Sequence, residues 1–578
     1  QRGEDSGSNI VHRDVALAPF DTFVQTTDHP ARSPHQKPPT MRSPLLALLL
    51  PICAAAPAQW ITPTENTRVS GTGSVQAATP MSAPGPDGST YITWFEGASG
   101  YRLMMQRLDA DGFALWDAGG IVVSDEPQNS ALFRFDFTSD NAGNAIVAFQ
   151  DERSGNLDVV AYRVAPDGTM LWGNGIALTT PGSTGLAPVI GVLNDDRVVI
   201  AWTTDRSPST AAYRILPATG LPVQADPEEI SSVGNCGRPK VVPNSDGGFW
   251  IQYAEQQGSF LNPATMYATR FASDGTPLLN SQVSTRTISG FYFPSPISDG
   301  HDGFYIAFNS GNAANASLTD VYLQRLRDDG STWTEAGTAV ETGATTNRYA
   351  NNTAPALLND ADGLMIAYSR KNTSQSEGGI HVQRFDTAGT ALLGANGVNV
   401  VASSADLPEP FGTVAAIDGA CFGYSTGGFN SETIRAVIVA GDVYPIAVAS
   451  TPSSIDDAVL LPFQGAQAVI VWQDSRFGGS VLAQPIVVPT TAGIAERDGI
   501  DVQLVYGDGP ALFFATSTAT PTTLMIHAAD GKCVAERNLP PQPAGALVPL
   551  TFADQAAGVL FISLSGENGR NTWRMVMP

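Results

Sequence analysis

The chain repeats one hydrophobic pattern eight times: a short apolar run that ends in an aromatic residue. The runs are rich in β-branched and apolar residues, which is typical of buried β-strands. Successive closing aromatics lie between 48 and 60 residues apart along the chain. They are Trp94, Phe149, Trp202, Tyr253, Phe308, Tyr368, Tyr424 and Trp472. A recurrence of this length indicates a repeat architecture, because each unit is long enough for one supersecondary motif.

A second run follows within most copies and ends in a glycine turn, as at residues 106–112 and 162–168. A short run with Trp or Leu comes next, and we interpret Leu115-Trp116 and Leu171-Trp172 as short strands. A Gly-flanked apolar run, such as residues 175–178, then closes the copy, although the eighth copy lacks this part. Since no segment keeps a 3.6-residue period, each copy is predicted to form about four antiparallel strands.

Four-stranded units of this length match the blades of a β-propeller, in which each sheet buries its faces against its neighbours around an axis. The recurring aromatics are expected between blades, where burying each one contributes roughly 1.5–3 kcal/mol. Residues 66–75 resemble the end of a repeat, which the eighth copy lacks, so they are predicted to supply the last blade's outer strand. We predict an all-β chain with eight blades within residues 59–490. Seven blades are the alternative, because the copy at Tyr424 is degenerate.

Residues 41–58 have the pattern of a signal peptide. Arg42 follows Met41, Leu45 begins an apolar stretch, and residues 56–58 fit the small-residue cleavage rule. The stretch is shorter than the roughly 20 residues that cross a bilayer, and no later segment reaches that length. The mature chain is therefore expected to have no membrane span, with a lipoprotein anchored through Cys53 as the alternative.

Residues 1–40 contain no Met and are polar, Pro-rich and aperiodic. We expect them to be a disordered, non-native extension upstream of a true start at Met41.

The net charge narrows the range of partners, and the number of cysteines limits the disulfides that the chain can form. The chain has 55 acidic and 31 basic residues, a net charge of −24, 43 % hydrophobic residues and 15 % charged residues. This composition is typical of a globular protein. The negative net charge argues against nucleic acids and anionic lipids as partners. After the signal peptide only Cys236, Cys421 and Cys533 remain, too few for a disulfide framework. One bridge and three thiols are both open alternatives.

Two copies carry an aromatic–Gln-Asp-x-Arg element, at residues 149–153 and 472–476. With the Gln-Arg and Asp-x-x-Gly turns of the other copies, this element resembles tandem units of secreted proteins from the Bacteroidetes lineage. The resemblance covers most of residues 78–490. It implies an extracellular repeat domain and no defined activity.

From residue 491 a compact β pattern replaces the repeat, and we predict a small β-sandwich over residues 491–578. Its hairpin at 529–534, its strand at Gly558 and its basic last strand at Arg574 resemble the C-terminal sorting domain of the type IX secretion system. The family's Asn-Pro opening motif is absent. The resemblance implies contact with the secretion machinery and a secreted or outer cell-surface location. A plain β-sandwich appendage is the alternative.

Isolated polar motifs favour structural roles. His301, His381 and His527 each stand alone, without the short spacing that metal ligands need. The segments 109–112 and 360–363 are predicted to be glycine turns instead of calcium loops, because strands flank them.

Three Asp–Arg pairs could line a binding face, but we interpret them as pairs that fix hairpin turns. They are Asp151/Arg153, Asp205/Arg206 and Asp474/Arg476. Residues 328–333 partly resemble the Asp-box hairpin of sialidase-type propellers, with Leu326 in place of the leading Ser or Thr. A sialidase-like site would also need three Arg gathered with a Tyr and acidic partners.

No catalytic, cofactor-binding or metal-binding residue is predicted, and no cofactor is expected. Repetition without a unique catalytic cluster favours a secreted or cell-surface binding or scaffold module over an enzyme, with a glycan or a protein as its ligand. The alternatives are an extracellular hydrolase acting on glycans and an inert repeat passenger used in adhesion or gliding.

Overall fold

The computed structural model describes much of the chain after residue 59. The described ranges are 60–71, 76–97, 100–128, 135–230, 234–259, 262–289, 294–341, 343, 345–350, 354–358, 363–416, 419–440, 442–487, 502–506, 510–514, 518, 520–528, 533–543, 546–550, 558–566 and 569–577. The expected extension 1–40 and signal peptide 41–58 lie outside these ranges. No helix in the described ranges is long and apolar enough to pass through a membrane.

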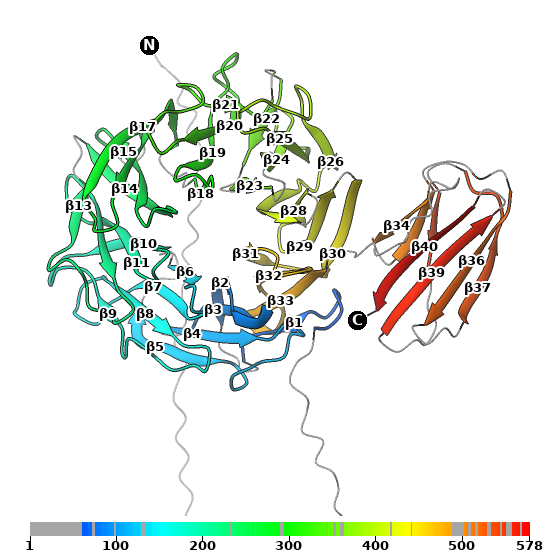
Figure 1. Cartoon of the computed structure of the whole chain (residues 1–578), viewed down its shortest axis with the longest axis horizontal. Coiled ribbons are helices and arrows are strands. Elements are labelled where there is room, and N and C mark those ends of the chain that lie inside the picture. Colours follow the sequence, from blue (N-terminus) through cyan, green and yellow to red (C-terminus); the bar gives the residue numbers. More distant parts are fainter. Residues whose placement is uncertain are drawn as a thin grey trace, which may run out of the picture. The chain divides into compact units, whose positions relative to one another are not determined.

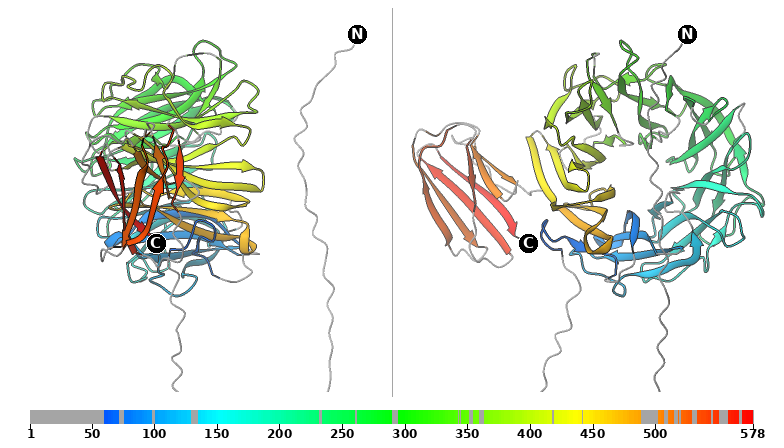
Figure 2. Two further views of the ribbon diagram at one scale, coloured as in Figure 1. Left: turned by 90° about the vertical axis from the view of Figure 1, so that its right-hand side faces the viewer. Right: turned by 180° about the vertical axis from the view of Figure 1, so that it is seen from behind.

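Antiparallel sheets follow one another around a ring along residues 67–487 (Figure 1). The view from behind in Figure 2 shows the same circular order. We number the sheets 1 to 8 along the chain. The expectation of an all-β chain is confirmed, because the only helical segments in the described ranges are two short 3-10 turns, η1 (Pro86–Gly88) and η2 (Arg476–Gly478). This arrangement is a β-propeller.

Sheets 1 to 4 each pair four strands in sequence order. Sheet 1 has β2 (Ala77–Pro84), β3 (Thr90–Glu96), β4 (Tyr101–Leu108) and β5 (Ile121–Gln128); sheet 2 has β6 (Asp136–Ser139), β7 (Ala145–Asp151), β8 (Asp158–Val164) and β9 (Ile176–Ala177). Sheet 3 has β10 (Gly185–Val192), β11 (Val198–Thr204), β12 (Ala211–Leu216) and β13 (Glu228–Ile230); sheet 4 has β14 (Asn235–Pro243), β15 (Phe249–Gln256), β16 (Ala264–Phe271) and β17 (Pro277–Ile288).

Sheets 5 and 7 keep this plan, whereas sheet 6 has a fifth strand and sheet 8 takes its fourth strand from the N-terminal part of the chain. Sheet 5 has β18 (Pro296–Ser298), β19 (Phe304–Gly311), β20 (Thr319–Leu326) and β21 (Thr338–Ala339); sheet 6 has β22 (Asn347–Tyr349), β23 (Ala356–Leu357), β24 (Leu364–Lys371), β25 (Gly378–Phe385) and β26 (Val398–Ser404). Sheet 7 has β27 (Glu409–Ala416), β28 (Gly419–Gly428), β29 (Ser431–Ala440) and β30 (Asp442–Ser453); sheet 8 has β31 (Ile455–Leu460), β32 (Gln467–Asp474), β33 (Ser480–Val487) and β1 (Thr67–Arg68).

The recurring aromatics lie on β3, β7, β11, β15, β19, β24, β28 and β32. As expected, they lie in apolar clusters that neighbouring sheets share. All of them are buried, from Trp94 at 0 % exposure to Tyr424 at 5 %. The sequence interpretation was wrong about the Trp-containing runs, which are not strands. A single bridge joins Leu108 to Ala114, and another joins Val164 to Met170, after which the chain leaves the sheet. The missing strand is the inner one, such as β10, which the repeat pattern did not reveal.

The Trp side chains of these runs instead donate hydrogen bonds to a turn of the next sheet. The indole Nε1 of Trp116 in sheet 1 donates to the carbonyl of Pro166 in sheet 2, at 3.2 Å. Three further indoles make the equivalent bond to the following turn: Trp60 to Ala110 at 2.8 Å, Trp172 to Ala218 at 2.9 Å and Trp333 to Thr387 at 3.0 Å. We call this repeated contact the indole clasp.

The Gln of the Gln-Asp-x-Arg element makes a second kind of contact between sheets. Gln150 on β7 donates to the carbonyl of Gly185 on β10 at 2.7 Å. Gln473 on β32 accepts a hydrogen bond from the backbone N–H of Thr79 on β2, at 3.1 Å. Adjacent sheets are therefore tied by polar contacts as well as by the apolar side chains between them.

The ring closes through the N-terminal strand, as the sequence predicts. In sheet 8, β1 pairs with β33, with Thr67 opposite Ala483. The Asn66 side chain donates to the carbonyl of Val448 at 2.7 Å and to Gln484 at 3.0 Å. Its Oδ1 accepts a hydrogen bond from Arg476 at 2.9 Å. One buried amide thus joins β1 to sheets 7 and 8.

Residues 502–577 contain two further sheets, drawn in orange and red in Figure 1. One has the order β34 (Val502–Tyr506), β35 (Pro510–Phe514) and β38 (Leu547–Pro549); the other has β37 (Cys533–Leu539), β36 (Thr522–Ala528), β39 (Gly558–Gly566) and β40 (Gly569–Met577). Leucines from both sheets, such as Leu512 on β35 and Leu564 on β39, share one apolar cluster. The strands β34 and β35 were not expected, and most of the turn at 529–534 lies outside the described ranges.

Replacing Asn66 tests the closure of the ring. Asn66 is 2 % exposed and has a φ of 62°. We expect Asn66→Ala to lose about 2–3 kcal/mol of the free energy of unfolding, because buried partners lose their hydrogen bonds. Asn430→Ala is the matched control, since Asn430 is exposed with a φ of 60° and should lose only the roughly 1 kcal/mol of backbone strain. Urea unfolding followed by Trp fluorescence measures both, and equal losses would contradict the closing role of Asn66.

Candidate functional site

The loops that could carry a site emerge at one end of the sheets. Adjacent strands are antiparallel, so the turn between the second and third strands lies at the same end as the link from the preceding sheet. For sheet 3 these segments are residues 205–210 and 178–184. We call this end of the propeller the link face.

A cavity of about 460 Å³ lies at the link face of sheet 3, within the roughly 300–1,000 Å³ typical of small-molecule sites. We call it the link pocket. Hydroxyl groups dominate its lining, beside two carboxyl groups, one guanidinium and one indole. The lining residues are Thr179, Thr180, Gly182, Ser183, Thr184, Trp202, Thr204, Asp205, Arg206, Ala212, Pro227 and Glu229.

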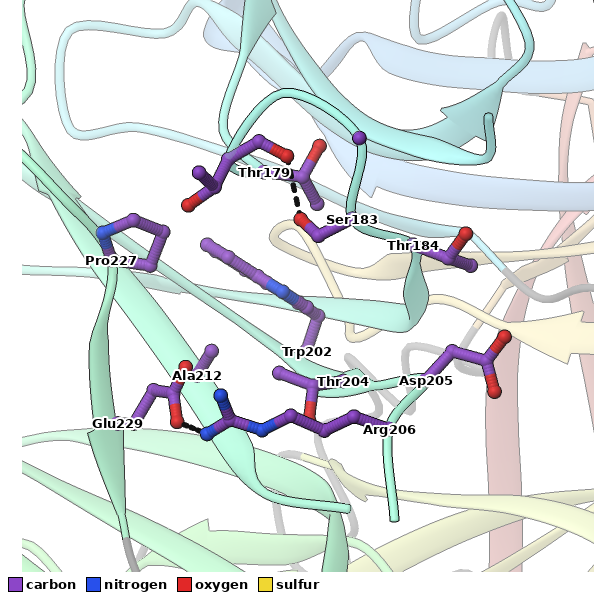
Figure 3. Close-up of a pocket in the computed structure, with 12 residues that line it drawn as sticks. Thr179, Ser183, Thr184, Trp202, Thr204, Asp205, Arg206, Ala212, Pro227 and Glu229 are labelled. Carbon is purple, nitrogen blue, oxygen red and sulfur yellow. Dashed lines mark hydrogen bonds and ion pairs between the residues drawn. The ribbon is translucent and has the colours of Figure 1, made fainter. Parts of the chain in front are cut away.

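The recurring aromatic of sheet 3 forms the floor of the link pocket. Figure 3 places the Trp202 indole between the link that carries Thr179 and Ser183 and the pair formed by Arg206 and Glu229. Gly185 lets the link lie close to this indole, because a Cβ there would come within 2.8 Å of Trp202 Cδ1. A glycine at the start of β10 therefore positions the wall of the pocket.

The charged groups of the pocket are unequally paired. Arg206 forms an ion pair with Glu229 on β13, and Thr210 Oγ1 donates to Glu229 at 3.1 Å. Arg206 also donates to Thr210 at 3.2 Å, which ties the turn to the outer strand. In the described part of the chain, the Asp205 carboxylate makes no side-chain hydrogen bond or ion pair. One acceptor at the pocket is thus left for a ligand.

The hydroxyls of the link offer further polar groups. Ser183 Oγ donates to the carbonyl of Thr180 at 2.6 Å and so stabilises the turn. Thr180 is exposed and Thr184 is half-buried, and neither hydroxyl has a protein partner within the described ranges. These groups both donate and accept hydrogen bonds.

Two of the three predicted Asp–Arg pairs fix turns, as interpreted from the sequence. Arg153 binds Asp151 and also donates to Tyr162 and to the carbonyl of Asn174. In sheet 8, the backbone N–H of Arg476 donates to Asp474 at 2.9 Å. Burial would raise the pKa of Asp474, but hydrogen bonds from Arg476 and Trp472 outweigh it and hold that pKa below its ordinary value. The third pair, Asp205 and Arg206, lines the link pocket.

Two other sequence candidates, residues 109–112 and residues 328–333, have structural roles. Asp109 accepts hydrogen bonds from the backbone of Asp111 and Phe113, and Gly112 has a φ of 86°, so this segment is the predicted turn. Residues 360–362 lie outside the described ranges. Residues 328–333 end in the indole clasp of Trp333.

Among the described residues, no three His, Cys, Asp or Glu side chains are placed to hold a metal ion. No disulfide joins Cys236, Cys421 and Cys533 within the same part of the chain.

Sequence reasoning missed a buried cluster of charges between sheets 5 and 6. The Glu341 carboxylate accepts hydrogen bonds from Arg348 at 2.7 Å and from the Tyr368 hydroxyl at 2.8 Å. Arg348 also binds Asp320 at 3.2 Å, and His381 Nδ1 lies 3.5 Å from Glu341. The side chains of Arg348, Glu341 and Asp320 are at most 3 % exposed.

This cluster and the link pocket occupy equivalent places in the repeat. The backbone of Val340 binds Val321 as that of Leu178 binds Val159, so Glu341 corresponds to Thr179. Tyr368 corresponds to Trp202, since both end the aromatic run. The signal available in the sequence was the charged residue Glu341 directly after Val340, at the end of a short strand-like run. Because the cluster is buried and internally paired, it joins sheets 5 and 6, and the link pocket is the candidate site.

Comparisons with known proteins add distant structural similarities. No known family matches the chain, and no curated protein matches it. A PL25 ulvan lyase bound to a GlcA(1-4)Rha3S unit is similar at 8 % identity, over 73 % of this chain and 96 % of its own, with a TM-score of 0.38. An α-L-arabinanase from Penicillium chrysogenum is similar at 12 % identity, over 57 % and 99 %, with a TM-score of 0.33. The Hadza microbial sialidase Hz136 is similar at 12 % identity, over 69 % and 77 %, with a TM-score of 0.34.

The buried cluster predicts a pH dependence of stability. Burial lowers the pKa of His381 from the ordinary 6.5, and Arg370 and Arg348 lower it further, although Glu341 opposes them. Below about pH 6.5, His381 therefore binds more protons in the unfolded chain than in the folded chain, so the contribution of this residue to stability falls on acidification. We expect His381→Gln to reduce the loss of melting temperature between pH 7.5 and pH 5. The exposed His301 is the control, and an equal effect of His301→Gln would contradict the assignment.

Proposed function

We propose that this chain is an extracellular β-propeller that binds a glycan in the link pocket. The observation that carries the proposal is the lining: hydroxyl groups and the unpaired Asp205 carboxylate surround a cavity of small-molecule size above a buried indole. Sugars present dense arrays of hydroxyl groups, which donate to carboxylates and exchange hydrogen bonds with Thr and Ser. The function is thus binding, in agreement with the module expected from the sequence.

Hydrogen bonding to Asp205 is the central step of this proposal. A carboxylate has two oxygens and about four acceptor sites, so it accepts from two neighbouring hydroxyls of one sugar ring. Hydrogen bonds to a charged group contribute about 1.5–3 kcal/mol, more than neutral ones. The hydroxyls of Thr180 and Thr184 lie on the link beside it and provide orientation.

A second function, cleavage of the bound glycan, is favoured by one observation. Two carboxyl groups, those of Asp205 and Glu229, line the same cavity. Glycoside hydrolysis uses a pair of carboxyl groups on either side of the scissile bond. Against this role, Glu229 is held in an ion pair with Arg206.

The number of blades, the C-terminal domain and the export route are also part of the proposal. Each of sheets 1 to 8 forms one blade, giving eight blades within residues 59–490. The two sheets of residues 502–577 form a β-sandwich that belongs to a domain over 491–578. Support for the sandwich comes from the leucines that both sheets bury together. The resemblance of this segment to type IX sorting domains, with the signal-like segment 41–58, supports export to the outer surface or the medium.

A glycan array and calorimetry test the binding function. We expect the full chain to bind glycans, and Asp205→Asn to weaken the affinity about tenfold or more, as loss of a charge-assisted hydrogen bond predicts. Asp111→Asn removes an exposed carboxylate outside the pocket and should leave binding unchanged. Equal affinities of Asp205→Asn and the wild type would exclude the pocket as the site. The same glycans are also assayed for new reducing ends. If the full chain generates them and neither Asp205→Asn nor Glu229→Gln does, cleavage is favoured over binding alone.

Deletion of residues 491–578 tests the export route. In a host with a type IX secretion system, the truncated chain should accumulate in the periplasm, because it lacks the segment that resembles the sorting domain. The full chain is the control and should reach the surface or the medium. Unchanged export of the truncated chain would refute the sorting role and would not affect the proposal of glycan binding.

A further inference from the structure

We infer that the link pocket selects neutral sugars and excludes carboxylated and sulfated ones. This specificity rests on the proposed glycan-binding function and names the class of glycan that the pocket takes. It follows from how the three charged side chains of the pocket are arranged: Asp205, Arg206 and Glu229.

The only cation among the described lining residues is already neutralised. Arg206 lies between Glu229, with which it forms an ion pair, and the Thr210 hydroxyl, to which it donates. Its side chain is 54 % exposed, and that of Glu229 is 33 % exposed. Both contacts use Nη2, so the rest of the guanidinium remains accessible. An acidic sugar that reached it would still lie beside the Glu229 carboxylate, so the contact gains no net electrostatic attraction.

The remaining charge of the pocket repels anions. Asp205 contributes a carboxylate with no protein partner in the described ranges, so the pocket as a whole carries one excess negative charge. An anionic group of a ligand that lies beside Asp205 is therefore repelled by the like charge of this carboxylate. The net charge of −24 over the chain adds a long-range repulsion that salt screens.

Neutral sugars avoid this penalty and use the same groups. Their hydroxyls donate to Asp205, and the hydroxyls of Thr180 and Thr184 provide further donors and acceptors without adding charge. The carboxylate that repels an acidic sugar is therefore the group that binds a neutral one. Specificity arises here from repulsion of the wrong ligand as well as from attraction of the right one.

The test compares acidic polysaccharides with their own carboxyl-reduced forms, which keep the same linkages. Several such pairs are presented to the full chain, and affinities are measured at low and at physiological salt. We expect the reduced form of at least one pair to bind at least tenfold more tightly than its acidic parent. Because salt screens the repulsion, this ratio of affinities should be smaller at physiological salt than at low salt. Equal or tighter binding of the acidic forms would overturn the specificity and leave glycan binding intact. Binding of neither form of any pair would overturn both proposals.

Glu229→Gln provides a gain-of-binding arm. This substitution removes the negative partner of Arg206 and leaves the guanidinium free for a carboxylate, so we expect affinity for acidic forms to rise about tenfold. Asp111→Asn lowers the negative charge of the chain by the same amount outside the pocket and should not change the ratio. An identical change of the ratio in both variants would assign the selectivity to overall charge and overturn the role of the pocket.

Discussion

Burial of two faces per sheet is the constraint on which this fold depends. A lone sheet of this chain would expose apolar side chains on both sides, and each sheet covers its neighbour instead. The contact is not only apolar: the indole clasp reaches from Trp116 to Pro166, and Gln150 on one sheet binds Gly185 on the next. These polar bonds have direction, so they fix how one sheet is placed on the next, whereas apolar burial alone does not.

Much of this plan could be predicted from the sequence, because the same burial recurs in every copy. The aromatics at Trp94 and Tyr424 repeat since both face an interface, and the N-terminal strand was found because its pattern completes the last copy. The Trp of residues 115–116 misled the interpretation, since an apolar residue next to a short apolar run has the same pattern whether it pairs as a strand or binds a neighbouring turn. Only coordinates distinguish these two partners.

The candidate site was harder to predict, because it arises from departures from the repeat. The pair Asp205 and Arg206 was visible in the sequence, but its partner Glu229 comes from a different strand and has no local motif. At the equivalent interface between sheets 5 and 6, Glu341 and Arg348 fill the corresponding region with paired charges. The same backbone thus carries an open polar cavity at one interface and a closed ionic contact at another, and the side chains decide which.

Closure by β1 has a consequence for biosynthesis. Thr67 is translated long before its partner Ala483, which is made near the end of the ring. Such a long sequence separation makes folding slow, because the loop entropy must be lost before the contact forms. A nascent chain therefore leaves one face of its first sheet and one face of its last completed sheet uncovered until translation has passed sheet 8. Dependence on chaperones is greatest during that interval, and a truncated translation product would retain both uncovered apolar faces permanently.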